Sequence, residues 1–158
     1  MNNAGISFSK LGSSASEMLS FIHLKSFGDK LDKGWSTQEI KDLFDIPNTN
    51  GYVLSVSNEP CGFAIIRGVI DEVEIITFCI LPKQCHNGYA TLLLEWIIKD
   101  LQSNSFKKMF LEVRENNVAA IGLYEKCAFD IIGRRKGYYQ INKHQKIDAL
   151  VMQRDLSK

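Results

Sequence analysis

The sequence predicts an α/β protein in which helices cover both faces of a mixed, mostly antiparallel central sheet. Three observations support this fold class. Segments whose apolar residues alternate with a period of two are interleaved with segments that show the helical period of about 3.6. Two strand segments in the middle third flank a short turn, which indicates an antiparallel hairpin. A strand, a long helix and another strand then follow one another, which predicts one parallel pair.

The chain has 158 residues and contains no low-complexity tract, internal repeat or linker rich in Pro, Gly and Ser. Chains of about 150 residues bury enough surface for one core, so we expect residues 1–158 to form a single domain. The 19 Lys and Arg residues against 18 Asp and Glu leave a net charge of +1. This balance creates no field that would favour a nucleic acid or an anionic membrane as partner.

The first third of the chain is predicted to be mainly helical. A short strand is expected near residues 6–8, followed by a helix from Ser14 or Ser16 to about Phe27. A second helix begins after Ser36, because Ser36 and Glu39 have the spacing of a capping box, in which each side chain accepts a hydrogen bond from the other residue's backbone N–H. The apolar face of this helix consists of Ile40, Leu43 and Phe44.

The middle third changes to strands. Residues 52–56 and 61–66 flank the turn segment Ser57-Asn58-Glu59-Pro60 and predict the hairpin. A third strand runs from about Glu72 to Leu81 and ends at Pro82, which has no N–H to donate to a sheet. The next helix has an apolar face with the spacing i, i+3, i+4 and i+7, formed by Leu94, Ile97, Ile98 and Leu101.

The last third repeats the alternation of strand and helix. Strands are expected over residues 109–113, 129–133 and 147–152, and a helix over 117–126 separates the first two. The complete predicted order is therefore β-α-α-β-β-β-α-β-α-β-β. Periodicity alone indicates no function for this fold.

The segment from Pro82 to Thr91 joins a strand to the start of a helix and contains Gly88. The first backbone N–H groups of a helix have no intrahelical acceptor, and a glycine lets an anion approach them closely. This arrangement suits a phosphate group. The same segment is also compatible with an ordinary strand-to-helix turn, because one glycine is a weak signal.

A second motif lies in residues 111–126 and reads LEVRENNVAAIGLYEK, with Phe129 soon after it. It resembles the L-E-V-R-x-x-N-x-x-A-x-x-L-Y-E segment of the Gcn5-related N-acetyltransferases (GNAT), in the RimI-like branch that acts on a ribosomal-protein alanine. Residues 133–139 and 148–152 resemble the R-R-x-Y-Y and D-A-x-x-M elements that close chains of this branch. The resemblance extends from about Ser20 to Asp155 and implies the GNAT fold.

The resemblance implies a binding site for acetyl-coenzyme A (acetyl-CoA). The strand end that would pair with the pantetheine arm consists of Phe78, Cys79 and Ile80. The loop that would hold the pyrophosphate consists of His86, Asn87, Gly88, Tyr89, Ala90 and Thr91. Asn117 matches an asparagine that contacts this co-substrate, although Asn is also a preferred N-cap residue and that role alone would account for it.

The chain departs from the family pattern in two places. Cys85, His86 and Asn87 stand where relatives usually carry Gln or Arg followed by two Arg, so backbone N–H groups must do more of the phosphate binding. We therefore expect weaker or more salt-sensitive binding than in relatives with these arginines. Ala128 replaces a glycine at the end of the 117–126 helix, where a left-handed conformation would cost a residue with a Cβ about 1–2 kcal/mol.

The resemblance also assigns two catalytic roles. Glu112 resembles the general base that removes a proton from the acceptor amine, and Tyr124 resembles the general acid that protonates the departing thiolate. Glu112 is otherwise a solvated glutamate on a half-exposed strand, and Tyr124 is otherwise a core tyrosine. Tyr138, Tyr139 and the basic run 134–136 lie where relatives bind the peptide, or else form an amphipathic strand edge.

The expected function is that of a protein N-terminal acetyltransferase, which transfers acetyl from acetyl-CoA to the α-amino group of a ribosomal protein. An α-amino group has a pKa of about 8 and is easier to deprotonate than a lysine, at about 10.4. The alternatives are an acetyltransferase for a small-molecule amine and a catalytically silent acetyl-CoA-binding module. The sequence does not predict the oligomeric state.

Neither a membrane segment nor a metal site is expected. The apolar runs are shorter than the ~20 residues of a transmembrane helix, and the N-terminus lacks the pattern of a secretory signal, so we expect a cytoplasmic protein with reduced thiols. The cysteines and histidines show no metal-ligand spacing; they are Cys61, Cys79, Cys85, Cys127, His23, His86 and His144.

Overall fold

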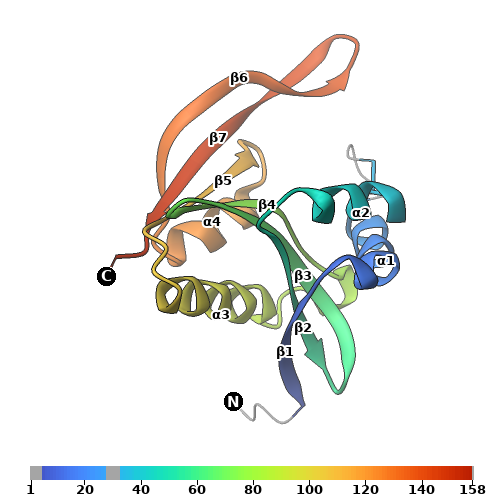
Figure 1. Cartoon of the computed structure of the whole chain (residues 1–158). Helices are drawn as coiled ribbons and strands as arrows, with labels where there is room; N and C mark the ends of the chain where they lie inside the picture. Colours follow the sequence, from blue (N-terminus) through green and yellow to red (C-terminus); the bar gives the residue numbers. More distant parts are fainter. Residues whose placement is uncertain (1–4, 28–32, 158) are drawn as a thin grey trace.

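The computed structural model describes residues 5–27 and 33–157. Figure 1 shows the fold, whose elements follow the predicted order. The strands are β1 (Ile6–Leu11), β2 (Thr49–Val56), β3 (Glu59–Val69), β4 (Glu72–Ile80), β5 (Lys108–Arg114), β6 (Asp130–Asn142) and β7 (Gln145–Asp155). The helices are α1 (Ser16–Phe27), α2 (Thr37–Asp45), α3 (Tyr89–Ser103) and α4 (Val118–Lys126), and short 3₁₀ turns cover Ser13–Ala15 and Pro82–Gln84.

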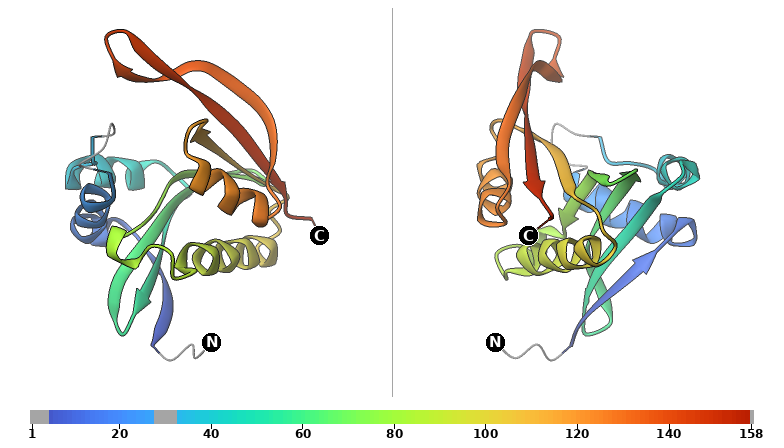
Figure 2. Two further views of the ribbon diagram at one scale, coloured as in Figure 1. Left: turned by 180° about the vertical axis from the view of Figure 1, so that it is seen from behind. Right: turned by 60° about the vertical axis from the view of Figure 1, so that its left-hand side comes forward.

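All seven strands form one sheet in the order β1-β2-β3-β4-β5-β7-β6. Every neighbouring pair is antiparallel except β4 and β5, which are parallel and are joined through α3. The mixed, mostly antiparallel sheet and its single parallel pair confirm the predicted fold class. The sheet contacts α1 and α2 on one face and α3 and α4 on the other (Figures 1 and 2).

Each face of the sheet has its own apolar core. The four predicted apolar positions of α3 are all buried, and they pack with β2 to β5, α4 and β7. The smaller core lies under α1 and α2 and is formed by Leu19, Ile22, Ile40, Val53, Phe63, Ile65 and Cys79. The predicted capping box of α2 is also present, because the Glu39 N–H donates to Ser36 Oγ and the Ser36 N–H donates to Glu39 Oε2.

A β-bulge interrupts β4 at Ile76. On the neighbouring strand Ile65 pairs with Thr77 and Ile66 pairs with Ile75, so Ile76 is the extra residue. A bulge reverses the side to which the following residues point. Val73 and Ile75 belong to the core under α3 before the bulge, and Phe78 and Ile80 pack against the same core after it.

The parallel pair is short. β4 and β5 pair only over Glu72–Glu74 with Lys108–Phe110, although β4 continues to Ile80 and β5 to Arg114. Beyond Glu74 and Phe110 the two strands no longer pair with each other, and the bulge at Ile76 follows two residues later. This divergence is the feature that positions the site described below.

Two sequence expectations on strand length were wrong. The turn between β2 and β3 is tighter than the predicted Ser57–Pro60 segment, because Ser57 and Asn58 both have positive φ angles, 51° and 67°, and β3 already begins at Glu59. The strand expected over residues 129–133 instead runs from Asp130 to Asn142. Most of β6 is exposed, so its sequence lacks the apolar alternation that marks a half-buried strand.

Ala128 occupies the left-handed position at the end of α4, with a φ of 57°. The Ala128 N–H donates to the Glu125 carbonyl and the Phe129 N–H donates to the Tyr124 carbonyl, both at 3.0 Å. These two bonds form a Schellman motif, in which glycine is the usual residue. The helix therefore ends where the sequence indicated, at the expense of a strained alanine.

Replacing Ala128 with glycine should stabilise the protein. Removal of the Cβ relieves the left-handed strain, and we expect a gain of about 1 kcal/mol, or a rise in melting temperature of about 2–4 °C. Ala119→Gly, in the first turn of the same helix, is the matched control and should lower the melting temperature. Calorimetry of the two variants checks this prediction, and a destabilised Ala128→Gly protein would contradict it.

Candidate active site

A cleft of about 760 Å³ lies where β4 and β5 have separated. Its walls include the parts of the two strands that do not pair with each other, residues 75–80 of β4 and 111–114 of β5. Other lining residues come from α1, the segment before α2, the loop before α3, the start of α3, α4 and β6. The cleft is thus the space between two diverging strands, and it is reached by residues from both faces of the sheet.

The backbone of the diverging strands contributes polar N–H and C=O groups to the cleft. Each residue of a strand carries one N–H and one C=O, and groups on a strand edge without a neighbouring strand need other partners. The β4 edge that faces β5 from Ile75 to Ile80 has no strand beside it. An extended molecule with amide groups could pair with this edge as an added strand would.

The first turn of α3 forms one end of the cleft. Gly88 is the N-cap of this helix, with a left-handed φ of 78° and no side-chain cap. A Cβ added at Gly88 would meet no atom within 4 Å, so the glycine serves the backbone conformation and leaves open space before the helix. The N–H groups of Tyr89, Ala90 and Thr91 therefore start an uncapped helix that borders the cleft.

Of the two residues that precede Gly88, His86 lines the cleft and Asn87 does not. His86 has a left-handed φ of 65° and lines the cleft. Asn87 is the one predicted binding residue absent from the lining; its Nδ2 donates to the carbonyls of Gln84 and Cys85 and stabilises the turn. The other nine predicted binding residues all line the cleft: Phe78, Cys79, Ile80, His86, Gly88, Tyr89, Ala90, Thr91 and Asn117.

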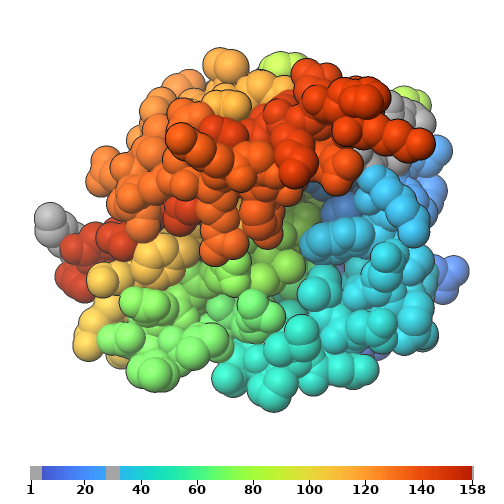
Figure 3. Space-filling model, turned by 90° about the horizontal axis from the view of Figure 1, so that it is seen from above, coloured from blue at the N-terminus to red at the C-terminus, as the bar shows by residue number. Residues whose placement is uncertain are grey.

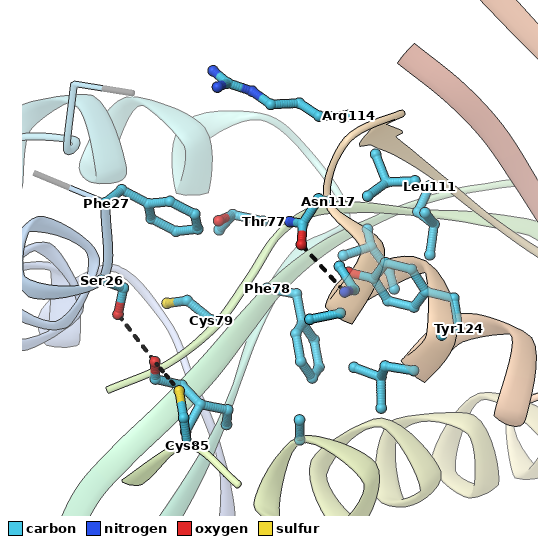
Figure 4. A pocket seen from close by; sticks show the side chains of 18 of the residues that line it. Ser26, Phe27, Thr77, Phe78, Cys79, Cys85, Leu111, Arg114, Asn117 and Tyr124 are labelled. Atoms are coloured by element: carbon cyan, nitrogen blue, oxygen red, sulfur yellow. Dashed lines mark hydrogen bonds between the residues drawn. The ribbon is translucent and has the colours of Figure 1, made fainter. Parts of the chain in front are cut away.

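The end of β4 is held from two sides. The Ile80 carbonyl accepts a hydrogen bond from Ser26 Oγ of α1 at 3.4 Å and a weak one from Cys85 Sγ at 3.8 Å (Figure 4). Burial raises the pKa of the Cys79 thiol to about 12, so this thiol is protonated at neutral pH. Cys79 can therefore act through its backbone rather than as a nucleophile.

Asn117 combines the two interpretations made from the sequence. It is the N-cap of α4, where its Oδ1 accepts a hydrogen bond from the Ala120 N–H at 3.2 Å (Figure 4). It also lines the cleft. The capping bond uses the oxygen, and the amide nitrogen is the group that can serve a ligand.

Tyr124 lies in the core under α3 and α4 and also reaches the cleft. Its ring packs against Phe78 and Phe129, with centroid distances of 6.3 and 5.7 Å. Burial raises the pKa of the Tyr124 hydroxyl well above its usual value. The hydroxyl therefore keeps its proton at neutral pH and can donate it in a hydrogen bond or as an acid.

Glu112 reaches the cleft from the opposite face of the sheet. Its neighbours Leu111 and Val113 point into the α3 and α4 core, so Glu112 points to the other face. Glu112 Oε1 forms an ion pair with Arg135 Nε at 3.0 Å, and 18% of the Glu112 side chain is exposed. The structure thus brings both predicted catalytic residues to one cleft. Tyr124 reaches it from the buried core, and Glu112 reaches it from the partly solvent-exposed face of the sheet.

The sequence did not indicate the aromatic residues of α1 and the following segment. His23 is buried, stacks on Trp35 at 4.5 Å and lies 4.5 Å from Phe27, measured between ring centroids. The Trp35 N–H donates to His23 Nδ1 at 3.0 Å, and all three residues line the cleft. The i, i+4 spacing of His23 and Phe27 was the available signal, but it does not distinguish a site from a core.

The β6–β7 hairpin extends beyond the rest of the sheet, as Figure 1 shows. The space-filling view shows this hairpin and α2 on one face of the molecule (Figure 3). Tyr139 lines the cleft and its ring lies under the Arg114 guanidinium, 4.7 Å from the centroid, whereas Tyr138 is exposed. The hairpin therefore contributes one of its two tyrosines to the site.

The part of the chain that the structure describes has neither a membrane-spanning helix nor a metal-binding cluster. None of its helices is long and apolar enough to span a membrane. Residues 5–27 and 33–157 contain no group of three or more His, Cys, Asp or Glu side chains arranged to hold a metal ion.

Comparison with known proteins identifies the family. The model of the acetyltransferase (GNAT) family matches residues 17–129, and the chain belongs to this family. A ribosomal protein bS18-alanine N-acetyltransferase of Haemophilus influenzae is 38% identical over 96 residues, which are 61% of this chain and 65% of that protein. The aligned part is therefore a little under two thirds of this relative.

Solved structures show the same fold over nearly the whole chain. The ribosomal-protein-S18-alanine N-acetyltransferase of Escherichia coli superimposes with a TM-score of 0.87 at 25% identity, covering 97% of this chain and 95% of that one. YncA of Salmonella typhimurium, a putative acetyltransferase with acetyl-CoA, has a TM-score of 0.80 at 14% identity, covering 98% and 95%. At that identity the second comparison concerns the fold alone.

The buried histidine should make stability depend on pH. Burial lowers the pKa of His23 to about 4, against 6.5 in an unfolded chain, despite the nearby Glu39 carboxylate. Between these values the unfolded state binds more protons, so the free energy of unfolding should fall as the pH is lowered from about 6.5 to 4, by about 3 kcal/mol.

This prediction is checked by urea denaturation across that pH range, together with an NMR titration of the His23 ring. His23→Gln should flatten the pH dependence, because glutamine can accept the Trp35 hydrogen bond but does not titrate. His144→Gln, at an exposed position, is the matched control and should follow the parent protein. A parent-like slope in His23→Gln would contradict the assignment.

Proposed function

We propose that this chain is an N-terminal acetyltransferase that transfers acetyl from acetyl-CoA to the α-amino group of an N-terminal alanine in a ribosomal protein. The observation that carries the proposal is the cleft, which Glu112 enters from one face of the sheet and Tyr124 from the other. The Haemophilus influenzae relative supports the choice of acceptor. We further propose that residues 1–158 form a single domain and that it works in the cytoplasm.

The residues present suit acetyl-CoA. A volume of about 760 Å³ is in the range of small-molecule sites, which is roughly 300–1,000 Å³. The uncapped N–H groups of Tyr89, Ala90 and Thr91 would bind the diphosphate, with Gly88 giving access and His86 beside it. Asn87 would support this loop through its turn, and the Asn117 amide would add a contact.

The edge of β4 would bind the rest of the co-substrate. The amide groups of a pantetheine arm can pair with the backbone of Phe78, Cys79 and Ile80, where no strand lies beside β4. A backbone N–H in this stretch would also stabilise negative charge on the thioester oxygen during the reaction. The bound acetyl-CoA would supply the activated thioester carbon, and the chain's own groups would handle the protons.

The two proposed catalytic groups act on opposite sides of the thioester. As the amine nitrogen bonds to the carbonyl carbon, Glu112 accepts a proton from the nitrogen, directly or through a water molecule. As the C–S bond breaks, the Tyr124 hydroxyl donates its proton to the sulfur. The raised pKa of Tyr124 ensures that this proton is present at neutral pH.

Removing either catalytic group should slow turnover. We expect Glu112→Gln and Tyr124→Phe to lower kcat by about 10²–10⁴-fold, with little change in the KM for acetyl-CoA, because each group acts mainly in the transition state. The measurement is thiol release with a peptide that begins with alanine. Glu125→Gln, on the exposed side of α4, is the matched control and should keep the parent kcat.

The same assay separates the proposal from its alternatives. The peptide is compared with an otherwise identical peptide whose α-amine is blocked and with spermidine. Faster turnover of spermidine would favour an acetyltransferase for small amines. Calorimetric binding of acetyl-CoA with no thiol release in the presence of peptide would favour a catalytically silent module.

Adding a permanent cation beside the proposed diphosphate site should strengthen binding. His86 borders the start of α3, so we expect His86→Arg to lower the Kd for acetyl-CoA about 3–10-fold, with a smaller gain at high salt. Calorimetry at two ionic strengths measures this, and His86→Gln is the uncharged control. Equal affinities of the two variants at low salt would place the diphosphate elsewhere.

A further inference from the structure

Two consecutive arginines of β6 have different partners. Arg134 forms ion pairs with Glu115 at 2.5 Å and with Asp148 at 3.0 Å. Arg135 forms an ion pair with Glu112 at 3.0 Å. Neighbouring residues of a strand point to opposite sides, which explains this division. Arg134 thus joins β7 and the segment after β5, and Arg135 reaches the carboxylate at the cleft.

The strand that carries Arg135 is fixed by an irregularity in the hairpin. Arg135 pairs with Ala149 and Tyr139 pairs with Ile147, so residues 136–138 of β6 oppose Asp148 alone. Within this bulge Gly137 has a left-handed φ of 60° and its N–H donates to Asp148 Oδ1 at 2.8 Å. Because Asp148 also binds Arg134, the backbone is anchored on both sides of Arg135.

The contact between Arg135 and Glu112 comes from outside the main cleft. A second groove of about 330 Å³ is lined by both residues, and Glu112 is also part of the main cleft. The ion pair joins Arg135 Nε to Oε1 of the Glu112 carboxylate. The ion pair engages Oε1, which leaves Oε2 available to accept a proton.

We propose that Arg135 is a positioning residue for Glu112. It holds the carboxylate through Oε1 at the border between the two cavities, which keeps Oε2 in one place for the acceptor amine. This role rests on the proposed function of Glu112 as the general base. Small displacements of a reacting group can cost up to about 10²-fold in rate, so an exposed ion pair with little effect on stability can still affect turnover.

The proposal predicts a specific kinetic effect of Arg135→Gln. We expect kcat with the alanine peptide to fall about tenfold, with unchanged KM values for acetyl-CoA and peptide. Arg135→Lys should recover part of the loss, because lysine restores the charge but not the geometry of Nε. Lys143→Gln removes the same charge from an exposed position at the tip of the same hairpin and is the matched control; it should keep kcat within about threefold.

A double-mutant cycle then tests whether Arg135 acts through Glu112. In a Glu112→Gln background, Arg135→Gln should cause no further loss of kcat. A tenfold additional loss in the double variant, or a parent-like kcat in Arg135→Gln, would overturn the proposal. An effect confined to the KM for the peptide would also overturn it, since Arg135 lies 5.4 Å from the Tyr138 ring and would then act in acceptor binding.

The outcome is separable from that of the proposed function. If Glu112→Gln itself retains the parent kcat, the assignment of Glu112 as base fails, whatever Arg135 does. If Glu112→Gln is slow and Arg135→Gln is not, only the positioning role fails. Circular dichroism and melting curves of each variant establish that the compared proteins are folded.

Discussion

The site depends on a sheet that stops pairing in its middle. Burying a backbone N–H or C=O without a partner costs about 1–3 kcal/mol, so strands normally stay together once they have met. Here β4 and β5 pair over three residues of each and then separate, and the bulge at Ile76 lies at the point of separation. The polar backbone groups released there must be satisfied by water or by a bound molecule. The cleft, its amide-lined wall and its access from both faces all follow from this interruption.

The interruption also explains how one cleft holds two groups with different surroundings. Tyr124 approaches from the core under α3 and α4, where burial keeps its hydroxyl protonated. Glu112 approaches from the face that α3 and α4 do not cover, where it has a charged partner and contact with solvent. Pairs of titratable groups in unlike environments are what acid–base chemistry at one pH requires. A sheet with continuous pairing between β4 and β5 would have separated these two residues, which lie on its opposite faces.

Local rules were sufficient for the order of the elements and for details such as the capping box at Ser36, whereas the family pattern drew attention to Ala128 as a possible left-handed position. Such local rules depend on residues close in sequence. The length of β6 and the bulge at Ile76 could not be predicted in this way, because an exposed hairpin lacks the apolar signal and a bulge reflects pairing with a distant strand. Of the ten binding residues predicted from the motif resemblance, nine line the cleft. The tenth, Asn87, donates its amide to the Gln84 carbonyl within the loop. The pairing of Glu112 with Arg135 joins residues 23 positions apart and leaves no local trace.

The charges of β6 have a consequence beyond the cleft. β6 is the last strand of the sheet, and such a border offers free N–H and C=O groups to any other extended chain. β6 carries the charged residues Arg134, Arg135 and Lys136 next to the irregular stretch around Gly137, so an approaching strand would meet charged side chains and a broken hydrogen-bonding pattern. Charged side chains and a break in the hydrogen-bonding pattern at this edge disfavour pairing of β6 with a further strand.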